Sequence, residues 1–225
     1  MAENEENKIN TEELKSEATN TVNQVKDTIK KVDIKKDSVE TKGFVVAMFK
    51  NPLEKIKEVA EDTKGKYLKY AIIVLVIWAA AKFLSRCFAI GWFWRPYNIF
   101  ENMWSIGVAT ITPLLSVLVM VLISFALNKK NKKPLTTVIS AVTIANIPTV
   151  VASVVSLLTI ISSQVSLITI PFASLCSVIS IVLTYFALKN VFGEEKNSDF
   201  IKKFVLIETL YYVAYIILSL LKIYI

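Results

Sequence analysis

Hydrophobic residues gather in long runs along the second two thirds of the chain. A transmembrane helix needs about 20 mostly apolar residues to cross the hydrocarbon core of a bilayer. Five stretches reach this length: Tyr70–Ile90, Ile106–Leu127, Leu135–Ile161, Val165–Leu188 and Phe204–Ile223. The pattern therefore predicts an all-α integral membrane protein, a bundle of five transmembrane helices that spans residues 67–225.

The N-terminal part follows a different pattern. Residues 1–66 carry 13 lysines and 14 acidic residues. Within them, apolar residues recur every three or four positions, which predicts a charged helix with one apolar stripe: Leu14, Ala18, Val22, Val25, Ile29 and Val32. We expect residues 1–42 to form a cytosolic segment. A solvated helix, a disordered segment and a coiled-coil-like helix that binds a partner are all compatible with this pattern.

A second amphipathic stretch, Gly43–Asp62, is richer in apolar residues. Asn51 stands where a helix N-cap is favoured, and Pro52 follows at a position where proline is tolerated. Lysines alternate with apolar residues here, as in helices that lie on an anionic membrane surface. We therefore expect residues 43–66 to form amphipathic juxtamembrane helices on the inner leaflet.

The orientation follows from the loops between the predicted spans, because lysine and arginine concentrate on the cytosolic side. The loop 128–133 reads NKKNKK, and the loop after the fourth span holds Lys189, Lys196, Lys202 and Lys203. The loop 162–166 has no charge. This alternation predicts a multi-pass protein of the cell membrane with its N-terminus in the cytosol and its C-terminus outside.

Aromatic residues concentrate in the first outer loop, at Trp92, Phe93, Trp94, Tyr97 and Trp104. Tryptophan and tyrosine favour the headgroup level of a bilayer, so we expect an interfacial belt. A ligand-binding aromatic cage is the alternative.

Small residues repeat along one face of two predicted spans. The third span has Ala141, Ala145, Thr149 and Ser153 four residues apart, and the fourth has Ala173 and Ser177, continued by Ser180 and Thr184. Small residues let transmembrane helices approach closely, so we interpret both faces as helix-packing surfaces. A polar pathway between the helices is the alternative.

Asn146 and Pro148 lie near the middle of the third span. Proline removes a backbone donor and kinks a helix, and asparagine in hydrocarbon needs a hydrogen-bond partner. Pro113 and Pro171 interrupt the second and fourth spans. Broken helices line the substrate sites of many transporters, whereas kinks in a purely structural bundle give the same pattern.

Glu208 is the only carboxylate within a predicted span, which makes it a candidate functional residue. Its depth differs from that of Lys82, so we do not expect the two to pair. We expect Glu208 to reach the membrane interface, Lys203 or a tyrosine hydroxyl.

The composition argues against catalysis. The chain has no histidine and only five glycines, which excludes histidine-dependent acid–base sites and glycine-rich phosphate loops. The two cysteines, Cys87 and Cys176, are expected to be small buried side chains rather than metal ligands. The basic excess belongs to the hydrophobic part, so it does not indicate nucleic-acid binding. We expect no enzyme activity, catalytic residue, metal or cofactor.

Three motifs appear in a defined order: FKNPLEKIKEVAED before the first span, IANIP in the third, and YFALKNVFGEEKNSDFIKKF between the fourth and fifth. Over residues 43–221 the chain resembles the Yip-domain family, the Ypt-interacting proteins, in a bacterial-type form. The resemblance implies a five-helix bundle with a cytosolic N-terminus and no catalytic residues. Eukaryotic members act in vesicle traffic with Rab-type GTPases as partners.

Two functions follow as hypotheses. The first is a membrane scaffold or adaptor, in which residues 1–62 recruit or organise a protein partner while the bundle sits in the lipid bilayer. The second is a small transporter or channel that uses the broken helices around Asn146 and Pro148. A closed homo-oligomer would serve either one.

Overall fold

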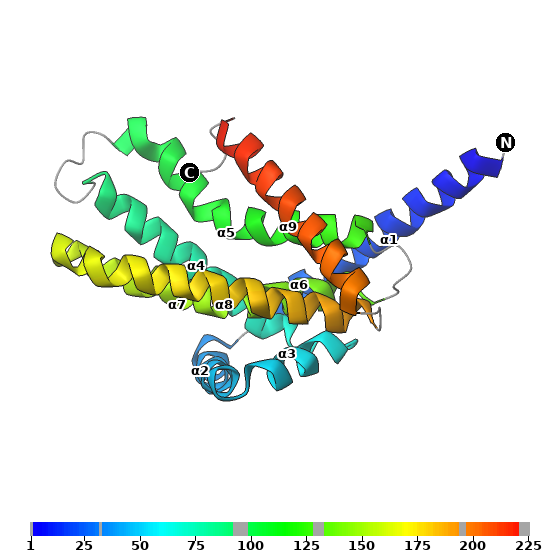
Figure 1. The fold of residues 1–225 in the computed structure, drawn as a ribbon, viewed down its shortest axis with the longest axis horizontal. Coiled ribbons are helices and arrows are strands. Elements are labelled where there is room, and N and C mark those ends of the chain that lie inside the picture. Colours follow the sequence, from blue (N-terminus) through cyan, green and yellow to red (C-terminus); the bar gives the residue numbers. More distant parts are fainter. Residues whose placement is uncertain (1, 32, 92–98, 128–132, 194–196, 221–225) are drawn as a thin grey trace.

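The computed structural model describes residues 2–31, 33–91, 99–127, 133–193 and 197–220 (Figure 1). All regular elements within these residues are helices. The aromatic residues Trp92, Phe93, Trp94 and Tyr97 lie outside the described residues. So do residues 128–132 of the NKKNKK loop, and Lys196.

Four helices in the described part of the chain are long and apolar enough to cross a membrane: α4 (Leu68–Ala89), α5 (Ile99–Leu127), α8 (Ser166–Phe192) and α9 (Asn197–Leu220). The third predicted span is broken into α6 (Leu135–Ala145) and α7 (Ile147–Ser156), which continues into the short 3-10 helix η2 (Leu157–Ile160). The two parts are bent by 46°. The described bundle thus has four candidate spans, and five if the bent pair crosses as one.

The break at Asn146 has a local cause. Pro148 has no N–H, so the carbonyl of Ile144 one turn earlier loses its helical donor. The N–H of Asn146 donates to the Thr143 carbonyl at 3.1 Å, a tightened turn, and α7 then restarts with its proline in the first turn. The kink predicted from the polar–proline pair is confirmed.

The hairpin of α7 and α8 lies along the centre of the bundle in Figure 1. A short 3-10 helix, η3 (Ser163–Val165), joins η2 to α8. α4 packs against α5, α6 and α7, and α9 packs against α5. α8 ends at Phe192 because Gly193 takes a left-handed conformation with φ of 85°.

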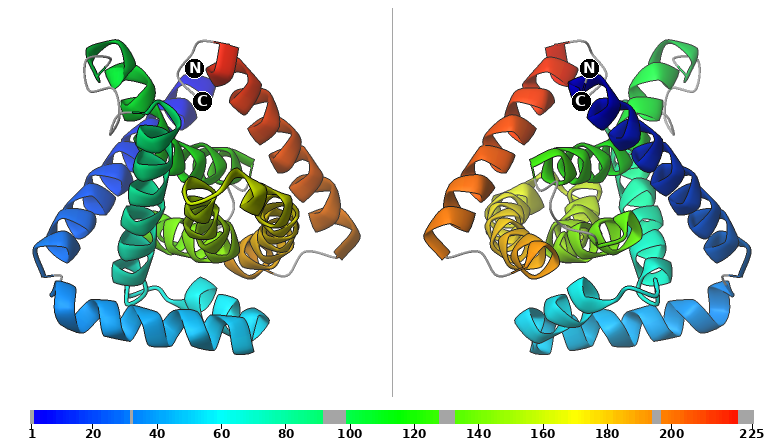
Figure 2. Two further views of the ribbon diagram at one scale, coloured as in Figure 1. Left: turned by 90° about the vertical axis from the view of Figure 1, so that its left-hand side faces the viewer. Right: turned by 90° about the vertical axis from the view of Figure 1, so that its right-hand side faces the viewer.

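The N-terminal part forms α1 (Ala2–Lys31), α2 (Ile34–Lys50) and α3 (Pro52–Glu61). The boundary expected between residues 42 and 43 therefore falls inside α2. Figure 2 shows α1, α2 and α9 on three sides of the central helices. α1 contacts α4 and α6, while α2 contacts α3 and α4.

α3 packs its apolar face onto the bundle instead of onto lipid. Ile56, Val59 and Ala60 are fully buried, and the helix lies against α6 and α8. Two hydrogen bonds fix it there: Lys133 Nζ donates to the Ala60 carbonyl at 2.8 Å, and Thr137 Oγ1 donates to the Asp62 carbonyl at 2.5 Å. Protein side chains therefore cover the apolar face of α3, and the position of this helix on the inner leaflet stays a prediction.

The start of α3 agrees with the sequence pattern, but its cap does not. The helix begins at Pro52, as predicted, yet the Asn51 side chain makes no capping hydrogen bond. Pro52 itself removes one of the N–H groups that lack a helical acceptor at the start of α3.

Candidate functional site

A cavity of about 180 Å³ lies between the helices of the bundle beside the break at Asn146, and it is partly open to the outside, since Ser177 and Tyr212 in its lining are exposed. All five candidate spans contribute to its wall. Its lining is Trp78 of α4; Ser116, Val117 and Met120 of α5; Val142 of α6; Asn146; Thr149 of α7; Ser177, Ser180, Ile181 and Thr184 of α8; and Glu208, Tyr211 and Tyr212 of α9.

Asn146 enters the cavity wall because the helix breaks at this residue. Its side-chain Nδ2 donates to the Val142 carbonyl at 2.9 Å, one turn earlier. This bond orients the amide and leaves its oxygen as an acceptor. The break thus places an oriented amide group on the cavity wall.

Glu208 supplies the only ionisable carboxylate among the lining residues, and no lysine or arginine lines the cavity. Within the described part of the chain the Glu208 carboxylate has no hydrogen bond and no ion pair. The expected partners, Lys203 and a tyrosine hydroxyl, do not bond to it, although Tyr211 and Tyr212 stand next to it in the lining. Lys82 is absent from the lining, in agreement with the expectation that the two do not pair.

Hydroxyl groups of α7 and α8 form one wall. Thr149 Oγ1 donates to Ser180 Oγ at 2.8 Å, and the Thr149 N–H also approaches Ser180 Oγ at 3.2 Å. Thr184 is buried one turn farther along α8. The small-residue faces predicted for the third and fourth spans therefore meet at this point and also line the cavity.

Aromatic rings form the apolar part of the cavity lining. Trp78 is 7% exposed, and its indole Nε1 is buried without a hydrogen-bond partner. Tyr211 and Tyr212 on α9 have ring centroids 5.6 Å apart at an interplanar angle of 73°. The cavity thus combines one acid, one amide, hydroxyls and three aromatic rings.

The structure brings some of the predicted residues together and separates others. Asn146, Glu208, Thr149 and Ser177 line the cavity. The remaining ones lie outside its lining: Pro148, Ala141 and Ala145 are buried beside the break, Pro113 is buried in α5, Ser153 and Ala173 are half-buried, and Pro171 is exposed on α8.

Sequence reasoning missed the aromatic part of the site. Tyr211 and Tyr212 follow Glu208 by three and four positions, a spacing that places all three on one side of a helix. This spacing could have indicated that the two tyrosines lie beside Glu208. Nothing in the pattern around Trp78 distinguished it from an ordinary span residue.

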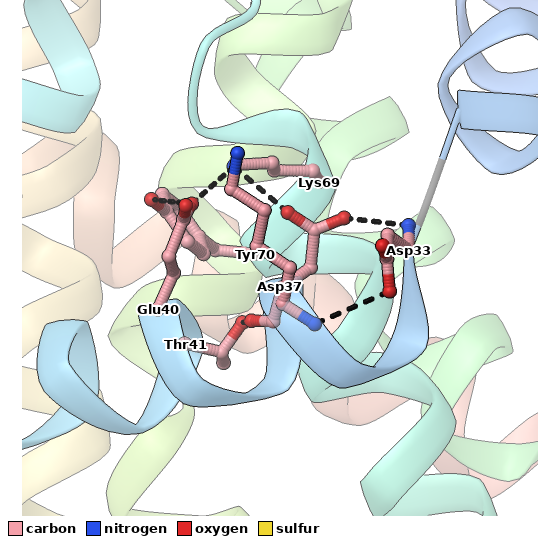
Figure 3. Close-up of polar contacts among 7 residues, drawn as sticks. Asp33, Asp37, Glu40, Thr41, Lys69 and Tyr70 are labelled. Carbon is pink, nitrogen blue, oxygen red and sulfur yellow. Dashed lines mark hydrogen bonds and ion pairs between the residues drawn. The ribbon is translucent and has the colours of Figure 1, made fainter.

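A second polar cluster joins α2 to the start of α4 (Figure 3). Lys69 Nζ donates to Asp37 Oδ1 at 3.0 Å and to Glu40 Oε2 at 2.6 Å. The hydroxyl of Tyr70 lies 3.4 Å from the same Glu40 oxygen. Asp37 in turn accepts the Asp33 N–H at 2.8 Å, so the first turn of α2 is built into the cluster.

The charges of this cluster support one another. The Lys69 hydrogen bond lowers the pKa of Glu40, and the same ammonium, with the Asp33 N–H, lowers the pKa of Asp37. The aromatic rings of Phe44 and Tyr70 stack beside the cluster, with centroids 5.0 Å apart. α2 is therefore fixed to α4 by both charge and ring packing.

Tyr67 closes the junction between α3 and α4. Its hydroxyl donates to Glu58 Oε2 at 3.0 Å. Burial, together with the Glu58 carboxylate, raises the pKa of Tyr67 to about 12.

Among the described residues, no cluster of three or more histidine, cysteine, aspartate or glutamate side chains is placed to hold a metal ion. No family model, curated protein or solved structure matches this chain.

Proposed function

We propose that this chain is a multi-pass membrane protein that binds a small polar solute in its central cavity and moves it across the bilayer. The observation that supports this best is the meeting of Asn146 and Glu208, from two separate candidate spans, in one cavity beside a broken helix. An ionisable group among apolar helices marks a functional site by default, and broken helices form the substrate sites of many transporters.

The cavity gives the proposal a direct test that needs no knowledge of the solute. Ser177 and Ser174 are a matched pair on α8: both are exposed, and both donate to the carbonyl four residues earlier, at 2.9 and 3.1 Å. Only Ser177 lines the cavity. Ser177→Cys and Ser174→Cys would be introduced separately into a chain in which Cys87 and Cys176 are alanine.

Charged, membrane-impermeant thiol reagents are then added to either side of liposomes that hold the full chain. We expect Ser177→Cys to react from both sides and Ser174→Cys from neither, because Ser174 faces lipid in this proposal. Reaction of Ser177→Cys from one side only would limit the cavity to binding. No reaction from either side would refute the proposed function.

The proposal includes three further points. The chain spans a membrane, its N-terminus is cytosolic, and it resembles the Yip-domain family. The apolar lengths of the candidate spans and the alternation of lysine-rich loops support a cytosolic N-terminus. The order of the family motifs supports the bundle architecture only.

A second candidate function, recruitment of a protein partner, is favoured by a specific observation on α1. Where the structure describes the apolar stripe predicted for this helix, the stripe is largely uncovered, with Val22 50% and Ile29 55% exposed. Glu17 nevertheless ties the helix to the bundle, because its Oε1 accepts the Leu135 N–H at 3.1 Å. A fixed helix with an open apolar stripe is a suitable binding surface for a partner helix.

The test compares two full-length double variants in co-purification from native membranes. Val22→Asp with Ile29→Asp places two charges on the stripe. Asn20→Asp with Gln24→Glu places the same charge on the opposite, exposed side of α1. We expect a partner to be lost only from the first variant. Equal retention in both would refute recruitment through this stripe.

A further inference from the structure

We propose that the solute bound in the central cavity is a small organic ammonium ion that also carries a hydrogen-bond donor. Glu208 would hold its charge, and the rings of Trp78 and Tyr212 would lie beside it in the cavity wall. This assignment rests on the proposed function, because it names the class of solute for the same cavity.

The charge of the lining favours a cation. Glu208 carries the only carboxyl group among the lining residues, and none of the described residues makes a hydrogen bond or ion pair with it. A carboxylate removed from water is costly unless a cation or hydrogen-bond donors compensate it. Since the wall supplies no cation, a cationic ligand complements the site and an anionic one is repelled.

The size of the cavity favours an organic ion over a bare metal ion. The cavity measures about 180 Å³. A water molecule occupies roughly 30 Å³ in the liquid, so the space fits a ligand of several heavy atoms. A single sodium or potassium ion would fill only a small part of it and would leave the aromatic rings without a role.

The rings supply the next argument. The faces of tryptophan and tyrosine attract ammonium groups, and recognition of quaternary ammonium ligands commonly uses such rings. Trp78, Tyr211 and Tyr212 come from α4 and α9, so ring-bearing helices contribute on more than one side of the cavity.

The polar groups of the wall define the rest of the ligand. The indole N–H of Trp78 has no partner, but its nitrogen is closed to a ligand oxygen in the cavity. The amide oxygen of Asn146 and the hydroxyl wall of α8 add acceptors for an N–H or O–H of the ligand.

The test measures binding of choline and of ethanolamine to the full-length protein in detergent by isothermal titration calorimetry. The neutral carbon isostere of choline, dimethylbutanol, and potassium ion serve as competitors. Glu208→Gln removes the charge at constant size. Thr209→Val is its matched control, because Thr209 is the next residue, exposed and outside the lining. Tyr212→Leu and Tyr215→Leu form a second pair on α9.

We expect at least one ammonium probe to bind and the neutral isostere to compete poorly. Glu208→Gln should weaken binding of ethanolamine, whose ammonium can donate to the carboxylate, about tenfold to a hundredfold, the range for a hydrogen bond to a charged group. Tyr212→Leu should weaken it roughly twofold to thirtyfold, and both control variants should leave the affinity unchanged. The tyrosine pair keeps the proposal testable if Glu208→Gln does not fold.

Four results would overturn the ammonium assignment: equal competition by the neutral isostere, an unchanged affinity in Glu208→Gln, binding of potassium ion, or binding of no probe at all. If Ser177→Cys still reacts from both sides in these cases, the proposed function stands with another class of solute. If Ser177→Cys does not react, the proposed function fails and the ammonium assignment fails with it.

Discussion

Thr149 Oγ1 donates a hydrogen bond of 2.8 Å to Ser180 Oγ, which joins the helix after the break to α8 at the cavity wall. The break between α6 and α7 leaves N–H groups at the start of α7 without a helical acceptor. The Thr149 N–H lies 3.2 Å from Ser180 Oγ, which is one of the acceptors available to it. The break is thus held in place by a neighbouring helix rather than left to the proline alone.

The first prediction concerns the strength of this link. Thr149→Val and Ser180→Ala remove the two hydroxyls with little change in shape. Hydrogen bonds between transmembrane helices average about 0.6 kcal/mol and reach about 1.7 kcal/mol. We expect a coupling energy in that range from a double-mutant cycle, measured by reversible unfolding in mixed micelles. Additive single effects would show that the two hydroxyls act separately.

A second prediction follows from the charges of Asp37 and Glu40. Lys69 lowers both pKa values below their ordinary values of 3.8 and 4.5. A lowered pKa in the docked state stabilises docking above the ordinary value, and this contribution disappears as the pH falls through the lowered one. We therefore expect α2 to loosen from α4 only below about pH 4.5.

The measurement for this prediction is the distance between spin labels at Val39→Cys, an exposed α2 position, and Thr63→Cys, in the chain without native cysteines. Lys69→Gln is the control. It should broaden the distance distribution already at pH 7 and remove most of the acid step. An identical pH profile with and without Lys69 would contradict the role given to this lysine.

The parts of the fold that depend on local chemistry were predictable from the sequence. The apolar runs located α4, α5, α8 and α9, and the polar–proline pair located the break at Asn146. The use of the α3 apolar face was not predictable, because a stripe of Ile56, Val59 and Ala60 suits lipid and protein equally well. Only the position of α6 and α8 decides between them.

The candidate site was also only partly predictable from the sequence. Asn146 and Glu208 stand out individually, since polar groups in apolar spans are rare. Their meeting in one cavity depends on how α9 packs against the rest of the bundle, and spacing along the chain carries no information on that. Trp78 joins the site for the same reason.

A third prediction tests the docking of α3. Ile56→Ala opens a hole in a fully buried position, and such changes cost about 2–5 kcal/mol. Leu53→Ala, on the same helix but 50% exposed, should stay within about 0.5 kcal/mol. The free energy of unfolding in mixed micelles distinguishes the two. Similar effects at both positions would mean that α3 does not bury this face against the bundle.

The last prediction concerns the membrane topology, on which both proposed functions depend. Thr63 precedes α4 and Gln164 lies between η2 and α8, and both are exposed. If the bent pair of α6 and α7 crosses the bilayer as one span, these positions lie on opposite sides of the membrane.

Thr63→Cys and Gln164→Cys, each in the chain without native cysteines, would be treated with an impermeant thiol reagent on intact cells. We expect Gln164→Cys to react and Thr63→Cys to react only after lysis, because lysine-rich loops stay in the cytosol. Reaction of Thr63→Cys alone on intact cells would invert the orientation.

Reaction of both on intact cells, or of both only after lysis, would place the two positions on one side of the membrane. The bent pair would then be a re-entrant segment, and the cavity at Asn146 would lie at the end of that segment rather than inside a continuous span.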